Sequence, residues 1–152
     1  MVLQSSSGRK RFNVLGAINA ITYQLVTVTN ETYINAESVC ELLEKLAQLN
    51  LITPMTLVLD NARYQYCKVV QERAAQLNIE LLFLPPYAPN LNLIERLWRF
   101  VRKQCLYAKH YEDFAHFKQA IETCLAETDK KHKSELISLL SLKFQDFRKL
   151  TL

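Results

Sequence analysis

Two acidic residues stand where a metal-dependent reaction would need them. Asp60 directly follows the apolar run 55–59, which predicts a short strand buried on both faces. Glu95 comes after 34 intervening residues, in the first turn of an expected helix that follows the proline-rich segment 85–89. Ligands gather at the carboxyl ends of strands in open α/β sheets, and paired carboxylates bind Mg²⁺ or Mn²⁺. The pair therefore predicts a metal site, although Asp60 also suits a turn and Glu95 also complements a helix dipole.

A basic segment follows Glu95 directly. Residues 1–95 carry 7 Lys or Arg against 8 Asp or Glu, whereas residues 96–110 carry five basic residues and no acid. Such a cluster suits the phosphate backbone of a nucleic acid, although a solvated helix face would show the same pattern. The residues expected to contact phosphate are Arg96, Arg99, Arg102 and Lys103.

The elements expected to position these residues alternate between strands and helices. We expect a leader, a hairpin, two strands that each follow a helix, and further helices at the carboxyl end. Their ranges are a flexible leader over 1–11, strands over 12–19, 22–29, 55–59 and 79–84, and helices capped by Asn35 and over 65–77, 91–107, 114–125 and from 134 onward. Strand–helix–strand order implies parallel pairing, so residues 12–152 form one α/β domain.

Composition narrows the class of protein. A chain of 152 residues with 49% hydrophobic content supplies one core, and its longest apolar runs of four residues are far short of a membrane span. The first residues lack the apolar stretch of a signal peptide, so we expect a cytoplasmic protein. The four cysteines have no metal-site spacing and are expected to be free thiols.

Two sequence blocks resemble those of a known family. LVLDNARYQ at 57–65 and FLPPYAPNLNLIERLWRFVRK at 83–103 are similar to the signature blocks of mariner-superfamily DDE transposases, with bacterial insertion-sequence members as the nearest match. The resemblance assigns catalytic and metal-binding roles to Asp60 and Glu95. The supporting positions of the two motifs are Asn61, Arg63, Pro86, Tyr87, Pro89 and Asn92. The chain departs from the family at Gln65, usually histidine, and at Leu93, often proline.

The resemblance implies a ribonuclease H-like mixed sheet flanked by helices, in which three acids bind two Mg²⁺ or Mn²⁺ ions. In the family the first acid lies on a central first strand, and we expect that strand and its aspartate to be missing here. The acids that precede Asp60 fall in a loop and a helix and are not placed to replace it: Glu31, Glu37, Glu41 and Glu44.

The implied function is metal-dependent DNA cleavage and strand transfer in transposition of an insertion sequence, in a chain that is an incomplete and inactive fragment of the catalytic domain. The expected partners are DNA and a second copy or another transposase chain, in the bacterial cytoplasm near the nucleoid, with no membrane and no small-molecule substrate. One alternative is a non-catalytic remnant that binds DNA or pairs with a transposase. Another is a different ribonuclease H-like nuclease, such as a resolvase, which the proline-rich block disfavours.

Overall fold

The computed structural model describes residues 1–4, 10–60, 62–85, 93–106, 111 and 113–140. These residues form five strands and five helices. In chain order they are β1 (Val2–Gln4), β2 (Arg11–Ile18), β3 (Leu25–Asn30), α1 (Ala36–Ala47), β4 (Met55–Leu59), α2 (Lys68–Gln76), β5 (Ile79–Phe83), α3 (Leu93–Cys105), α4 (Phe114–Thr128) and α5 (Lys133–Leu140). The strands and helices expected from residue 12 onward are therefore confirmed within the described residues, with boundaries shifted by a few residues. None of the helices in this part of the chain is long and apolar enough to span a membrane.

The strands form two sheets. β1, β2 and β3 make an antiparallel sheet in that order, and β4 and β5 make a parallel pair. The hairpin between β2 and β3 is closed by the Asn19 side chain, which accepts hydrogen bonds from the backbone N–H groups of Ile21 and Thr22. The parallel pairing of β4 with β5 was predicted, because each is preceded by a helix that carries the chain back.

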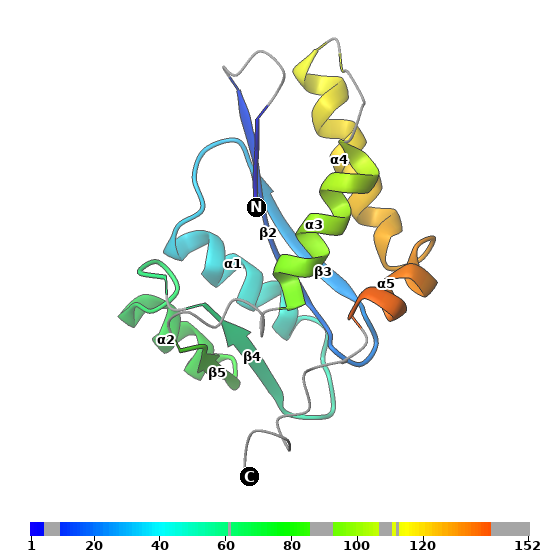
Figure 1. The fold of residues 1–152 in the computed structure, drawn as a ribbon. Helices are drawn as coiled ribbons and strands as arrows, with labels where there is room; N and C mark the ends of the chain where they lie inside the picture. The colour runs from blue at the N-terminus through cyan, green and yellow to red at the C-terminus, as the bar shows by residue number, and fades with distance from the viewer. Residues whose placement is uncertain (5–9, 61, 86–92, 107–110, 112, 141–152) are drawn as a thin grey trace.

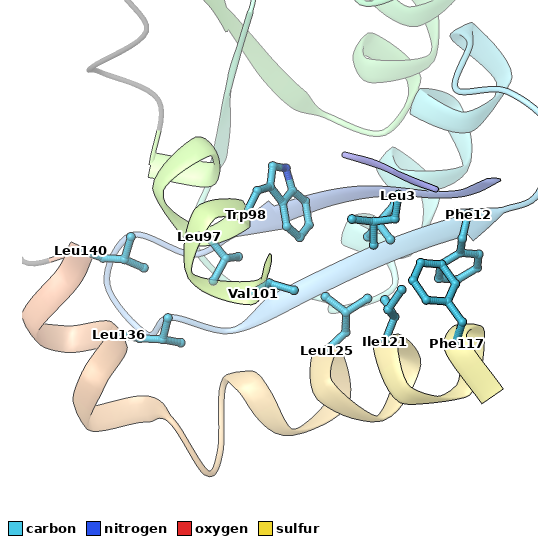
Figure 2. Close-up of a cluster of buried hydrophobic side chains, with 11 residues drawn as sticks. Leu3, Phe12, Leu97, Trp98, Val101, Phe117, Ile121, Leu125, Leu136 and Leu140 are labelled. Carbon is cyan, nitrogen blue, oxygen red and sulfur yellow. The ribbon is translucent and has the colours of Figure 1, made fainter. Parts of the chain in front are cut away.

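Helices cover the antiparallel sheet on both faces. Figure 1 shows α1 and α2 on one side of the β2–β3 ribbon and α3, α4 and α5 on the other. Because side chains alternate along a strand, Phe12 and Val14 of β2 face α3 and α4, while Leu15 and Ala17 face α1. A large apolar cluster lies on the α3 side. In Figure 2 its helical side chains converge on the strands that carry Leu3 and Phe12.

The parallel pair is covered on one face only. Met55 and Leu57 of β4, with Ile79 and Leu81 of β5, pack into the cluster formed with α1 and α2. On the opposite face Val58 is 43% exposed and its neighbour Leu82 is 53% exposed. The prediction that this strand is buried on both faces is therefore wrong. The second face of the parallel pair stays exposed because α3, α4 and α5 pack on the antiparallel sheet and not on β4 and β5.

The beginning of the chain differs from the predicted flexible leader. Val2–Gln4 forms β1, which pairs antiparallel with β2, and Leu3 is buried in the α3-side cluster. Burial of the Leu3 side chain lowers the free energy of this segment, and its backbone pairs with β2 at Phe12. These two contributions explain why residues 2–4 form a strand. Within the described residues β1 pairs with β2 alone, so it does not join the two sheets.

The cysteines follow the expectation in part. Cys40 and Cys67 are free thiols, whereas Cys124 is disulfide-bonded, so the prediction of a free thiol is wrong for Cys124. It lies on α4, which packs against α3, and cysteine spacing along a sequence does not reveal such contacts between helices.

Candidate metal and nucleic-acid site

Asp60 lies where the sequence predicted it, immediately after the last residue of β4. The end of that strand is held by pairing of Leu59 with Phe83, and by a hydrogen bond from the Leu84 N–H to the Leu59 carbonyl. Leu59 is buried, while Asp60 is half-buried. The side chain of Asp60 is therefore presented at the carboxyl edge of the parallel pair, the usual place for a ligand in such sheets.

A tight turn follows Asp60 and leads into α2. The backbone N–H groups of Gln65 and Tyr66 both donate to the Ala62 carbonyl, at 3.0 and 2.8 Å. The Cys67 thiol donates to the Tyr64 carbonyl at 3.6 Å. The turn also separates its side chains by environment: Gln65 is buried, while Tyr64 is 38% exposed. The segment after Asp60 is thus held by several hydrogen bonds and projects one tyrosine toward solvent.

The Tyr64 hydroxyl lies in the field of both predicted carboxylates. Burial raises the pKa of this phenol above its usual value, and the negative charges of Asp60 and Glu95 raise it further. A hydrogen bond from the Gln65 side chain acts in the opposite direction, because a donor to the phenolate oxygen favours the charged form. Two acids that are distant in the sequence, one directly after β4 and one on α3, therefore both raise the pKa of the same hydroxyl.

Glu95 lies in the first turn of α3, and this helix is strongly amphipathic. Leu97, Trp98 and Val101 are buried in the α3-side cluster. The helical period places Glu95 on the opposite, exposed face together with Arg99 and Arg102. The same burial that fixes the helix therefore presents an acid and a row of bases to solvent.

The start of β1 lies next to α3. Burial lowers the pKa of the Met1 amine, while the charge of Glu95 raises it and that of Arg102 lowers it. This amine donates a hydrogen bond to the Val14 carbonyl on β2. The edge of the antiparallel sheet and the acidic end of α3 thus meet near Glu95.

The two carboxylates suit one hard cation better than two. Mg²⁺ is commonly held by one or two carboxylates, with waters and substrate phosphates as its other ligands. Among the described residues no group of three acidic, histidine or cysteine side chains is placed to hold a metal. Two of the earlier acids have other partners, since Glu31 pairs with Lys118 at 3.6 Å and Glu44 pairs with Arg73. Within the described residues, the two-ion arrangement that the resemblance implies therefore lacks a third acid.

The other predicted site residues divide into three groups. Arg99, Arg102 and Lys103 are exposed on α3, and Arg63 is exposed in the turn after Asp60. Arg96 is half-buried and has interactions of its own. The remaining motif positions lie outside the described residues: Asn61, Pro86, Tyr87, Pro89 and Asn92. The sequence did not single out Tyr64, whose only signal is its closeness to Asp60 in the motif.

The sequence of this chain is similar to a known family and to a curated protein. The family model described as DDE superfamily endonuclease matches residues 1–118. An uncharacterised protein of Sinorhizobium fredii, y4pE/y4sA, is 43% identical over 37 residues, which cover 24% of this chain and 27% of the relative. The chain therefore spans about a quarter of the length of that curated relative.

Solved structures share the fold at low sequence identity. The Mos1 transposase catalytic domain, solved with raltegravir and Mg, gives a TM-score of 0.63 at 18% identity, covering 93% of this chain and 75% of that one. The catalytic core domain of BIV integrase gives 0.60 at 17% identity, covering 86% and 81%. A chain of the simian T-cell lymphotropic virus intasome gives 0.61 at 16% identity, covering 84% of this chain but 45% of its own. The mixed α/β fold is thus that of ribonuclease H-like transposase and integrase cores.

Proposed function

Because the chain belongs to the DDE superfamily endonucleases, we propose that it is the metal- and DNA-binding part of a transposase catalytic domain of the mariner superfamily, from a bacterial insertion sequence. The two motif blocks at 57–65 and 83–103 support the finer family assignment. The observation that carries the proposal is the place of Asp60 at the carboxyl edge of the parallel pair, in a chain whose residues 1–118 match the endonuclease family. A DNA-bound place in the bacterial cytoplasm is part of the same proposal.

In this proposal Asp60 and Glu95 hold one Mg²⁺ or Mn²⁺ ion. When bound, such an ion polarises a DNA phosphate and lowers the pKa of an attacking water or 3′-hydroxyl. Asp60 is fixed by the paired end of β4, and Glu95 is fixed by burial of the opposite face of α3. Both carboxylates are therefore positioned by rigid elements rather than by long loops.

DNA is the proposed substrate, and α3 is the proposed contact. Arg99, Arg102 and Lys103 share the exposed face of the helix with Glu95, so they lie beside that carboxylate. Basic side chains in this position neutralise phosphates without reading bases, because the contacts are to the backbone. We therefore expect binding that depends on salt and largely ignores sequence.

The 152-residue chain alone is proposed not to cut DNA. The proposal assigns two carboxylates to the site, Asp60 and Glu95, and no group of three acidic, histidine or cysteine side chains among the described residues is placed to hold a metal. Loss of only about 4 kcal/mol of transition-state stabilisation would slow cleavage about a thousandfold. We also propose that this chain assembles with a second chain, which is either another copy or a transposase partner.

The first experiment measures Mn²⁺ binding by calorimetry together with nicking of supercoiled plasmid in Mg²⁺ or Mn²⁺. We expect binding that is lost in Asp60→Ala and Glu95→Ala, and no nicking by the wild-type chain. The control is Glu80→Gln, since Glu80 is exposed on the neighbouring strand and hydrogen-bonds Thr56; this variant retains binding. Nicking that disappears in Asp60→Ala would overturn the proposed inactivity, and unchanged Mn²⁺ binding in both alanine variants would overturn the metal site.

The same preparation tests the DNA contact through the salt dependence of duplex binding. Each phosphate contact contributes about −0.9 to the slope of log K against log salt. The Arg99→Ala, Arg102→Ala double variant should therefore lose about two units of slope. Lys68→Ala is the matched control, because Lys68 is an exposed base on α2 that pairs with Glu72. Equal slopes for wild type and the double variant would contradict the role of α3.

A non-catalytic protein that binds DNA or pairs with an intact transposase is the second candidate. The absence of a third acid near Asp60 and Glu95, among the described residues, favours it. The two candidates separate when the chain is extended by the codons upstream of Met1 or mixed with a full-length relative. Cleavage that then depends on Asp60 supports a catalytic domain, while a chain that remains inert in both settings supports the non-catalytic protein.

A further inference from the structure

We propose that Arg11 and Tyr33 form a platform for an unpaired nucleotide of single-stranded DNA, with the base stacked on the Tyr33 ring and the phosphate held by Arg11. This inference goes beyond the proposed function, since the platform lies at the end of the antiparallel sheet and needs neither Asp60 nor Glu95. It rests on the proposed function only in taking DNA as the ligand.

The first observation is that an exposed aromatic ring carries a cation on one face. The Arg11 guanidinium lies over the Tyr33 ring, 4.2 Å from its centroid, yet Tyr33 remains 68% exposed. The ring is therefore accessible from the side away from Arg11. Proteins that bind single strands use such open rings, because every unpaired base can stack on them and a neighbouring arginine adds affinity. The bases of a duplex are already stacked on one another, so the platform suits a single strand.

The second observation is that hydrogen bonds fix the segment that presents the ring. The Tyr33 carbonyl accepts from the Asn30 side-chain amide at 2.9 Å and from the Ser38 hydroxyl at 3.3 Å. The Asn30 Oδ1 atom accepts from the Asn13 side-chain amide at 2.9 Å and from the Thr32 N–H at 3.2 Å. Asn13 is itself buried on β2. Because the backbone is held in this way, the ring loses little conformational freedom when a base stacks on it.

The third observation is how the guanidinium is held. The Arg11 Nε–H group donates to the Thr32 carbonyl at 2.9 Å, in an exposed hydrogen bond. An arginine side chain has five N–H donors, and this bond occupies one of them. The terminal amino groups carry the other four, for which a phosphate oxygen is a strong acceptor. Arg11 is therefore oriented by a backbone contact while its terminal amino groups remain suited to a phosphate.

A second base lies at the same end of the sheet. The Lys10 amine lies 5.3 Å from the centroid of the Phe114 ring, and Figure 1 shows the start of β2 beside the start of α4. Lys118, also on α4, is paired with Glu31 at 3.6 Å, whereas Lys10 is exposed. Lys10 is on the α4 side of β2 and Arg11 is on the side of Tyr33, so a strand that crosses the end of the sheet passes both bases. Such a path suits a chain of phosphates.

The test compares two single strands of equal length by fluorescence anisotropy in EDTA. One strand is made of thymidines, and the other is made of abasic sites, which have the same phosphates and no bases. Wild type should bind the thymidine strand about tenfold more tightly, as expected for stacking of one base. Tyr33→Leu should bind both strands equally, while Tyr33→Phe keeps the ring and the preference. Tyr66→Leu is the matched control that keeps the preference, because Tyr66 is 57% exposed but packs edge-on against Phe83.

Salt dependence separates the roles of the two residues. Arg11→Gln should reduce the slope of log K against log salt by about 0.7, the contribution of one phosphate of a single strand. Tyr33→Leu should leave this slope unchanged, because the ring carries no charge. Equal binding of the two strands by wild type would overturn the proposal, since the surface would then bind negative charge alone, as from an acidic peptide. A preference that survives in Tyr33→Leu, or that is lost in Tyr33→Phe, would also overturn it.

Failure of this inference is distinguishable from failure of the proposed function. Asp60→Ala and the Arg99→Ala, Arg102→Ala double variant should keep the preference for the thymidine strand. If wild type binds duplex DNA with the expected salt slope but shows no preference between the two single strands, only the platform is wrong. If wild type binds neither duplex nor single-stranded DNA, the proposed substrate fails and the platform fails with it.

Discussion

The antiparallel sheet and the parallel pair differ in how completely they are covered. β2 has helices on both faces, with Phe12 and Val14 buried on one side and Leu15 and Ala17 half-buried on the other. β4 and β5 are packed on one face, and Val58 and Leu82 remain exposed on the other. The better-supported region carries the helix with Glu95, and the less-supported region carries Asp60.

This difference teaches how the site is assembled. Each acid is fixed within its own region: Glu95 by the buried face of α3, and Asp60 by strand pairing at Leu59. In the described residues no strand pairing joins the two sheets, because β1 pairs with β2 alone. The relation between the acids therefore depends on packing of both sheets against α1 and its neighbours, rather than on a continuous hydrogen-bonded sheet.

The largest expected effect concerns the contact of α3 with β2. Trp98 is 4% exposed and lies directly on Gly16, where an added Cβ would come within 2.6 Å of the indole ring. Trp98→Ala should lower the free energy of unfolding by about 3–5 kcal/mol through lost burial and a cavity. Val58→Ala, on the open face of the parallel pair, should change it by no more than about 0.5 kcal/mol. Urea denaturation of both variants provides the comparison.

Gly16→Ala supplies the control for that contact. In the wild-type background it should cost about 1–3 kcal/mol, because the indole must shift. In the Trp98→Ala background the added methyl enters the vacated space, so the two effects should fall short of additivity. Additive losses would show that Gly16 is constrained by something other than Trp98. A loss for Val58→Ala as large as that for Trp98→Ala would remove the contrast between the two regions.

The order of elements and the pairing of β4 with β5 were predictable from the sequence because the local signals agree. Asn35 caps α1 with its side chain, as its position before an apolar helical pattern predicted. The uncovered face of β4 was not predictable, since an apolar run such as 55–59 is equally consistent with one or two packed faces. Which face a helix covers is decided by contacts between distant segments, and hydrophobic periodicity does not encode those contacts.

The candidate site was predictable to a similar degree. The strand-end position identified Asp60, and the motif spacing identified Glu95. Neither pattern pointed to Tyr64 or to the buried state of Gln65, because both depend on how the turn after Asp60 folds back on itself. The basic residues of α3 were visible as a charge cluster, and the structure adds that Arg96 is half-buried while Arg99 is exposed.

An intermediate effect is expected on self-association through the open face of the parallel pair. Exposed apolar side chains on a strand without charges promote contact with other chains, and Val58 is such a residue. Val58→Lys should raise the dissociation constant for self-association at least about tenfold, given roughly 1.5 kcal/mol for burial of one valine. Analytical ultracentrifugation measures this dissociation constant, and the free energy of unfolding of the variant should change little.

Val69→Lys is the matched control, because Val69 is an exposed apolar residue of α2 away from the β4–β5 face. It should leave self-association unchanged. If Val69→Lys and Val58→Lys dissociate the chain equally, the effect is one of net charge, and the open face is not a contact surface. If the wild-type chain is monomeric at all concentrations, the incomplete cover of the parallel pair has no consequence for assembly.

The smallest expected effect uses two helix caps, one on each side of the antiparallel sheet. The Asp113 side chain accepts hydrogen bonds from the backbone N–H and the ring of His116, both at 2.8 Å, whereas α1 is capped by the uncharged Asn35. The backbone hydrogen bond and then the ring contact lower the pKa of Asp113 below its usual value of 3.8. A carboxyl with a lowered pKa in the folded state stabilises that state above pH 3.8, and this contribution is lost as the pH falls through the pKa of the folded state.

Acid below about pH 4 should therefore weaken the α4 cap and leave the α1 cap intact. Denaturation across that range should show a shallower pH dependence for Asp113→Asn and a steeper one for Asn35→Asp, and identical profiles for all three proteins would contradict this assignment.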